Sequence, residues 1–227
     1  DFLEYIVTAT NHEYLLFFTE KGKCFWLRVF EVPEGSKTSK GRAVQNLINI
    51  EQDDKIKAYI RTKDLKNQEY INQMNVVMIT KNGTIKKTSL EAYSRPRTNG
   101  VNAIEIRDND ALLGARLTDG NSQIMIATKN GKCIRFPEEK ARAVGRGSIG
   151  VRGISLEEKD EVIGMIVVND LENDTVLVVS ERGYGKRTAV EDYRITNRGG
   201  KGVITLNITE KTGNPIAIQS VTDEDEL

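Results

Sequence analysis

The chain has 227 residues, 38% of them hydrophobic, and 33 Lys and Arg balance 33 Asp and Glu. This composition supports a packed core and argues against global disorder. No window approaches about 18 consecutive apolar residues, and the first residues lack a basic and apolar leader. The sequence therefore predicts a cytoplasmic protein without a membrane span, and the missing initiator Met indicates a piece of a longer chain.

In chain order, the first predicted element is an apolar strand that runs into a turn glycine, and this pattern occurs four times. The predicted strands are residues 14–19, 76–80, 124–128 and 176–180, and the turn glycines are Gly22, Gly83, Gly131 and Gly183. Spacings of 61, 48 and 52 residues separate these glycines. A period near 50 with several short strands is typical of stacked or radial β repeats.

A second glycine follows each turn glycine after 17 or 19 residues, at Gly41, Gly100, Gly150 and Gly202. Alternating apolar and polar residues then predict strands over 101–106, 151–156 and 203–208, while the first copy, 43–50, keeps the pattern less strictly. An acidic turn and a third apolar strand close the unit, as in 108–117 and 157–168. Single helical turns are predicted where capping boxes begin, at 88–91 and 188–191.

These patterns predict one all-β domain, a β-pinwheel or propeller-like disc of four-stranded blades in which neighbouring units cover one another's sheets. The four repeats span approximately residues 1–60, 70–118, 122–169 and 174–227.

The zero net charge conceals a strong segregation. The segments 21–42, 81–100, 129–152 and 181–202 hold 24 of the 33 basic residues and 8 of the 33 acidic ones. These segments therefore carry +16, and the rest of the chain carries −16. Solvated loops would explain any one segment, but four basic loops in register indicate a phosphate-binding edge. Because no helix suited to a DNA groove is predicted, we expect binding by shape, without sequence specificity.

The candidate DNA-binding side chains are the cations of these loops, and nearby glycines would let backbone N–H groups approach phosphates. The cations are Lys40, Arg42, Lys86, Lys87, Arg95, Arg97, Arg135, Arg142, Arg146, Arg152, Lys186, Arg187, Arg194, Arg198 and Lys201, and the glycines are Gly199, Gly200 and Gly202.

The sequence offers no catalytic or metal-binding set. Cys24 and Cys133 occupy equivalent repeat positions and are predicted to be buried free thiols, and His12 is the only histidine. The 145–150 segment matches G-x-G-x-x-G by letter, but its glycines lead into a strand and not a helix. Trp26 is predicted to pack in the core. We expect no metal, no cofactor and no catalysis by these residues.

Several segments resemble the C-terminal domain of the DNA gyrase A protein, of the bacterial type IIA topoisomerases, and the resemblance covers the whole chain. The segments are 11–12, 41–47 with 51–53, 150–154, 183–188 and 201–204. The resemblance implies a β-pinwheel whose blades exchange strands, and a basic rim that wraps double-stranded DNA so that gyrase introduces negative supercoils with ATP and Mg. It also implies partners: the rest of the gyrase A protein and, through it, the gyrase B protein in an A2B2 assembly at the nucleoid.

The sequence departs from the family in two respects. The wrapping signature Gln-(Arg/Lys)-Arg-Gly-Gly-(Arg/Lys)-Gly is expected upstream of Asp1, and residues 196–202 keep five of its positions. The family also has more blades than the four repeats found here. Two alternatives stay open: the equivalent C-terminal domain of topoisomerase IV, or a propeller that binds an acidic protein.

Overall fold

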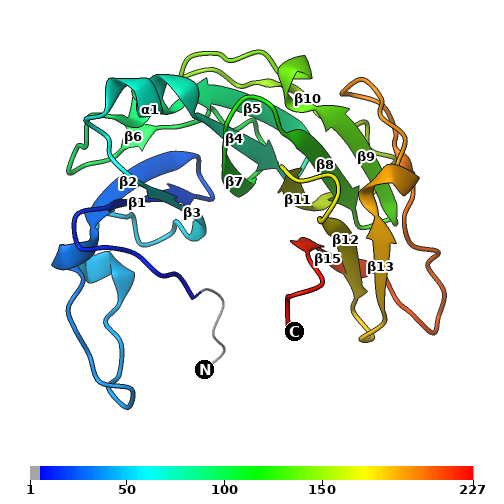
Figure 1. Cartoon of the computed structure of the whole chain (residues 1–227), viewed down its shortest axis with the longest axis horizontal. Helices are drawn as coiled ribbons and strands as arrows, with labels where there is room; N and C mark the ends of the chain where they lie inside the picture. The colour runs from blue at the N-terminus through cyan, green and yellow to red at the C-terminus, as the bar shows by residue number, and fades with distance from the viewer. Residues whose placement is uncertain (1–5, 227) are drawn as a thin grey trace.

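The computed structural model describes residues 6–226, and it is an open arc of four antiparallel sheets (Figure 1). Each sheet has three strands from its own repeat. The first sheet contains β1 (Tyr14–Thr19), β2 (Lys23–Arg28) and β3 (Ile56–Thr62), and the second contains β4 (Asn75–Thr80), β5 (Thr84–Ser89) and β7 (Leu112–Thr118). The third contains β8 (Gln123–Thr128), β9 (Lys132–Pro137) and β11 (Val162–Val168), and the fourth β12 (Thr175–Ser180), β13 (Gly185–Ala189) and β15 (Pro215–Val221).

The fourth strand of a sheet comes from the following repeat. β6 (Val101–Asn102) pairs with β2, β10 (Val151–Arg152) with β5, and β14 (Val203–Ile204) with β9. The fourth sheet has three strands, in the order β13-β12-β15. The predicted all-β fold and the four predicted apolar strands are thus confirmed.

The alternating segments after the second glycines were predicted as full strands, and this was wrong in length. In each segment only two residues are paired, because the chain crosses the neighbouring sheet edge and then bends around its turn glycine. In the first repeat the corresponding segment, 43–50, contains no strand but a 3-10 turn, η2 (Val44–Asn46). Within the described residues no preceding sheet is present for it to join.

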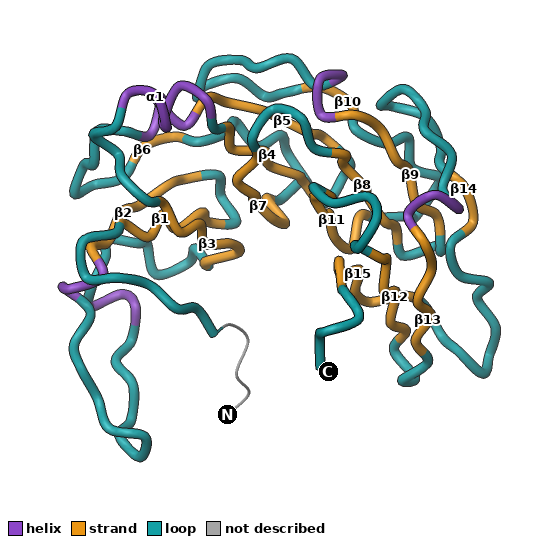
Figure 2. The backbone as a smooth tube through the Cα atoms, in the orientation of Figure 1, coloured by secondary structure: helices purple, strands orange, loops and turns teal. Residues whose placement is uncertain are grey.

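The helices are few and short (Figure 2). The sequence analysis predicted two of them. The predicted helical turns are 3-10 turns, η3 (Leu90–Tyr93) and η5 (Val190–Asp192), accompanied by η1 (Val29–Glu31) and η4 (Glu138–Lys140). The α-helix α1 (Gln68–Gln73), capped by Asn67, was not predicted, and it occupies the linker that makes the first repeat spacing the longest. No helix among residues 6–226 is long and apolar enough to cross a membrane.

Most of the core lies between neighbouring sheets, and one smaller cluster lies within the first repeat. Leu16 and Phe18 of the first sheet pack with Met78 and Leu112 of the second in one cluster. Equivalent clusters join the second sheet to the third and the third to the fourth. Trp26 packs against the first of these clusters, as predicted. Each repeat therefore depends on its neighbours for burial, as expected of a repeat array.

The inner strands β3, β7, β11 and β15 line the concave side of the arc, and the loops that follow η3, η4 and η5 lie along its convex edge (Figure 1). The fold thus places the loops of three of the four basic segments on one curved edge.

Candidate nucleic-acid interface

The convex edge is built from loops that overlap one another. The N–H groups of Ala103 and Ile104 both donate to Gly22 O, at 2.8 and 3.2 Å, and this anchors the second repeat's loop to the first repeat's turn. The same pair of bonds fixes Gly153 and Ile154 on Gly83 O, and Thr205 and Leu206 on Gly131 O. The repeated anchor gives successive loops the same placement on successive sheets.

Two arginines add equivalent hydrogen bonds between neighbouring loops along the edge. Arg146 Nη1 donates to Asn102 O at 3.1 Å, and Arg198 Nη1 donates to Arg152 O at the same distance. Asn102 and Arg152 each lie two residues after the second glycine of their repeats, so the two hydrogen bonds are equivalent. Arg198 Nε also donates to Lys140 O at 3.0 Å. These half-buried arginines fix the neighbouring loop and remain partly open to solvent.

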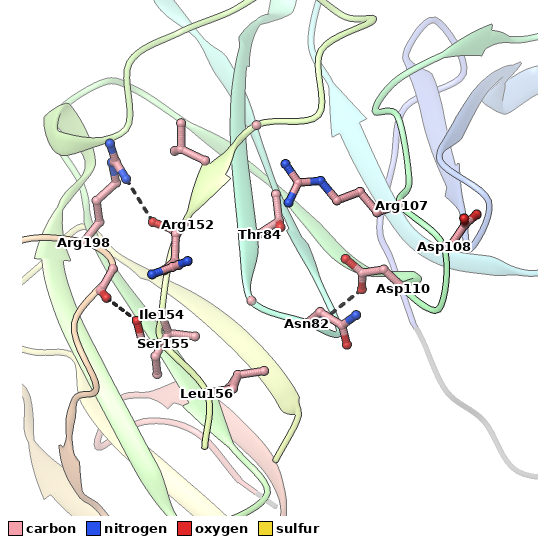
Figure 3. Close-up of a pocket in the computed structure, with 14 residues that line it drawn as sticks. Asn82, Thr84, Arg107, Asp108, Asp110, Arg152, Ile154, Ser155, Leu156 and Arg198 are labelled. Atoms are coloured by element: carbon pink, nitrogen blue, oxygen red, sulfur yellow. Dashed lines mark hydrogen bonds between the residues drawn. The ribbon is translucent and has the colours of Figure 1, made fainter. Parts of the chain in front are cut away.

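A hollow of about 850 Å³ lies in the middle of the edge, and three arginines from three different segments line it: Arg107, Arg152 and Arg198 (Figure 3). The guanidinium groups of Arg107 and Arg152 make no hydrogen bond or ion pair within the described residues and are exposed. Asp110 lines the same hollow, but its Oδ1 accepts the backbone N–H groups of Asn82 and Ala111 at 2.9 and 2.8 Å. The hollow thus combines the exposed guanidinium groups of Arg107 and Arg152 with one acid that is already hydrogen-bonded, Asp110, and one exposed acid, Asp108.

A second hollow, of about 450 Å³, lies where the first three repeats meet, and Lys23, Arg97 and Arg146 line it. Arg97 belongs to the loop after η3, and Arg146 belongs to the loop after η4. Cations therefore gather where consecutive loops meet, which is the arrangement expected of a surface that follows a phosphate backbone.

The structure separates the predicted cations into three groups. Ten are exposed: Lys40, Arg42, Arg95, Arg97, Arg142, Arg152, Lys186, Arg187, Arg194 and Lys201. Arg146 and Arg198 are half-buried, and Lys86, Lys87 and Arg135 are 1%, 8% and 6% exposed. Of the predicted glycines, Gly199 and Gly202 have φ of 83° and 77°, and Gly199 lines the larger hollow.

The prediction that Lys86, Lys87 and Arg135 present their charges to DNA was wrong. Lys87 Nζ lies 3.6 Å from the Glu138 carboxylate and donates to Glu138 O. Arg135 Nη1 donates to Val190 O and Tyr193 O, both at 3.0 Å. Lys87 and Arg135 thus hold the 3-10 turn of the following repeat and join neighbouring repeats inside the fold.

Lys86 is buried with no carboxylate partner in the described part of the chain. Its Nζ donates to Ala103 O and to Arg146 O, one from its own repeat and one from the next. Burial, with the Arg146 guanidinium nearby, lowers the pKa of Lys86 to about 8. Burial also lowers the pKa of Arg135.

Sequence reasoning missed Arg107, which lies outside the four basic segments. A usable signal was its position directly after the alternating segment 101–106, where the chain leaves the seam. Lys40 and Arg42 lie in the first repeat's free loop, away from the two hollows. Cys24 and Cys133 are buried free thiols, as predicted.

The strand exchange, the cores between sheets and the overlapping basic loops define an all-β repeat domain of the propeller class with a basic convex edge. The sequence model of the family described as "DNA gyrase C-terminal domain, beta-propeller" matches residues 13–62, 75–119, 122–169 and 174–214. The chain belongs to this family, and the resemblance drawn from the sequence is confirmed.

Named relatives agree with this assignment. The chain is 46% identical over 227 residues to the DNA gyrase A protein of Staphylococcus aureus (strain NCTC 8325 / PS 47), and spans 25% of that protein's length. A crystal structure of the C-terminal domain of DNA topoisomerase IV matches with a TM-score of 0.82 at 26% identity, covering 94% of this chain and 65% of the other. A DNA gyrase A C-terminal domain structure matches with a TM-score of 0.77 at 24% identity, covering 96% and 68%, and it supports the fold alone.

Proposed function

We propose that this chain binds duplex DNA along its convex edge, without sequence preference, through contacts to the phosphate backbone. The observation that carries the proposal is the repetition of the loop anchors, which places cations from consecutive loops together on one curved edge. The described residues include one α-helix, α1 of six residues, which is too short to read a groove. Contacts to phosphates fix the position of a duplex and carry no sequence information directly.

The curvature of the edge extends the proposal to wrapping. A duplex that followed successive loops would bend around the arc, and contacts along its length would offset the cost of bending. In the parent protein we propose that this supports negative supercoiling by an ATP-dependent type II topoisomerase, with the remainder of the gyrase A protein, the gyrase B protein in an A2B2 assembly, ATP and Mg supplied elsewhere. The domain itself would bind DNA in the nucleoid and catalyse nothing.

The C-terminal domain of topoisomerase IV is the second candidate, because the TM-score of 0.82 belongs to a structure of that domain. We favour gyrase because the 46% identity to a gyrase A protein extends over the whole chain. A propeller that binds an acidic protein would use the same cations. It would not require them to follow a curved path.

The free arginines of the larger hollow provide the test. In the double variant Arg107→Gln, Arg152→Gln, the slope of log affinity for duplex DNA against log salt concentration should fall by about 0.9 for each phosphate that is no longer neutralised. Neither side chain is used in the fold, so thermal stability should stay close to that of the native chain. The measurement is fluorescence anisotropy with a labelled duplex at several salt concentrations.

Arg116→Gln is the matched control, because Arg116 is an exposed arginine on β7, which lines the concave side. Its slope should equal the native slope. Equal slopes for the double variant and the native chain would remove this hollow from the DNA path, and a reduced slope for Arg116→Gln would place the DNA on the concave side.

A further inference from the structure

Lys86 is a buried cation at the point where three repeats meet. It lies on β5 of the second repeat and is 1% exposed. Its ammonium group donates to Ala103 O, directly after the strand β6 that joins the first sheet, and to Arg146 O in the loop of the third repeat. The side chain of Arg146 lines the second hollow of the convex edge. A buried ammonium group therefore holds one loop of the candidate interface.

The equivalent loop of the fourth repeat is held by a direct backbone hydrogen bond. Ile134 occupies the position of Lys86, three residues after the turn glycine, and is apolar. In that loop the Gly199 N–H donates to Gly153 O at 2.7 Å. Gly153 is equivalent to Ala103, whose carbonyl accepts the Lys86 ammonium group instead. In the third repeat a titratable side chain thus does what the backbone does in the fourth.

The groups around Lys86 do not compensate its charge, and within the described residues no carboxylate pairs with it. They are the Arg146 guanidinium from the third repeat's loop, the Tyr93 hydroxyl from η3, which donates to Ala103 O, and the Cys24 thiol from β2. Burial raises the pKa of Tyr93 and of Cys24, so both stay neutral near pH 8. The pKa of Lys86 is lowered to about 8, so Lys86 is the member of this group that changes charge there.

Loss of the proton from Lys86 has two consequences for the second hollow. Hydrogen bonds from an ammonium group are charge-assisted and roughly twice as strong as those from a neutral amine, so the loop that carries Arg146 is held less firmly. A positive charge also disappears behind a hollow that Arg97 and Arg146 line, and none of the described residues lining it is acidic. Both changes reduce the attraction for a phosphate group.

We propose that Lys86 positions Arg146 for DNA phosphates and makes duplex binding at the second hollow weaken as the pH rises above neutrality. The inference rests on the DNA binding proposed above and adds control by protonation to it. A phosphate in the hollow favours the charged amine, so bound DNA and the proton on Lys86 stabilise each other.

The stability of the fold should change with pH in the opposite direction. The pKa of Lys86 in the folded chain lies at about 8, below its ordinary value of 10.5. Between these two values the unfolded chain binds more protons than the folded chain at this residue, so its contribution to folding stability rises with pH. A loss of DNA affinity in this range would therefore not be explained by unfolding through Lys86.

The first test follows the free chain by NMR between about pH 6.5 and 9.5. The backbone carbonyl ¹³C shifts of Ala103 and Arg146 should titrate with a midpoint near pH 8. The carbonyl shift of Gly153 should not follow that midpoint, because the apolar Ile134 lies at the equivalent position. Lys86→Met should abolish the titration, and an apolar side chain is compatible with the fold at this place, as Ile134 shows.

The second test measures duplex affinity at pH 7 and pH 9 and equal ionic strength, by anisotropy with a dye whose emission does not depend on pH. The native affinity should fall about fivefold or more at about 0.1 M salt, and the log–log salt slope by about 0.9, which corresponds to one phosphate contact. Lys86→Met should bind with the lower affinity at both pH values. The double variant Arg107→Gln, Arg152→Gln, at the other hollow, should bind more weakly but keep the native ratio between the two pH values.

The outcomes separate this inference from the proposed function. DNA binding with the same affinity at pH 7 and pH 9 would overturn the role of Lys86 and leave binding along the convex edge intact. An equal loss of affinity in the native chain and in Lys86→Met would also overturn it, because another group would then be titrating. Absence of DNA binding at pH 7 and low salt would overturn the proposed function, and the role of Lys86 in it.

Discussion

Gly131→Ala should destabilise the chain by about 1–2 kcal/mol from backbone conformation alone. It should cost a further ~1–3 kcal/mol because the contact between the third and fourth repeats must shift to make room for the new Cβ. Gly131 has φ of 84°, and a Cβ there would collide with Leu206 O of the next repeat. The collision would disturb the bonds that Thr205 and Leu206 donate to Gly131 O. Urea unfolding gives the total loss, and hydrogen exchange of the Thr205 and Leu206 amides locates it.

Gly120→Ala separates the two contributions. It imposes the same left-handed conformation on an alanine at a half-buried site between β7 and β8, with room for the methyl group. It should therefore lose only the conformational part and leave exchange at the 203–206 segment unchanged. Equal losses for the two variants would contradict the role given to the seam.

Glu138→Ala should cost about 3–5 kcal/mol, which is the usual effect of removing one partner from a buried ion pair. Glu138 is completely buried, and its carboxylate accepts from Thr118 Oγ1 at 2.7 Å and from the Gly120 and Ser122 amides at 3.2 and 3.3 Å. Lys87, 8% exposed, would keep its charge with no acid beside it. Urea unfolding of the variant and the native chain measures the loss.

Two further variants refine this test. Glu139→Ala removes an exposed neighbouring carboxylate in the same turn, and should change stability by less than about 0.5 kcal/mol. Leu90 and Val190 occupy the Glu138 position in the second and fourth repeats, so Lys87→Met with Glu138→Leu should recover part of the loss. A Glu138→Ala loss as small as that of Glu139→Ala would show that the pair does not hold the seam.

The sequence predicts the parts of the fold that depend on local pattern. The turn glycines Gly22, Gly83, Gly131 and Gly183 all have positive φ, and the apolar strands before them are present in the structure. The short helix α1 was missed because six residues are too few for a helical period to be recognised.

The local sequence pattern does not show which strands pair with one another. The alternation in residues 101–106 indicates an extended segment with two faces, but not that Val101 pairs with Cys24 of the preceding repeat. The prediction for Lys86, Lys87 and Arg135 failed for the same reason. Cations that follow a turn are usually solvated, whereas each of these side chains donates to at least one carbonyl of the following repeat.

The sequence predicts which loops form the candidate interface, but not how their side chains are arranged. The charge count identified the loops after η3, η4 and η5, which share the convex edge, and also the loop of the first repeat, whose Lys40 and Arg42 line neither hollow. It could not distinguish cations that hydrogen-bond to the following repeat from cations that face solvent, because that difference depends on the register of neighbouring repeats. Arg107 was missed because it reaches the edge from outside the counted segments.

The most direct test of DNA binding along the convex edge is a titration of the native chain with two duplexes of equal length and unrelated sequence, over a range of salt concentrations. The proposal predicts equal affinities for the two duplexes and a log–log salt slope that corresponds to about six or more neutralised phosphates. A strong preference for one sequence, or no binding at low salt, would contradict it.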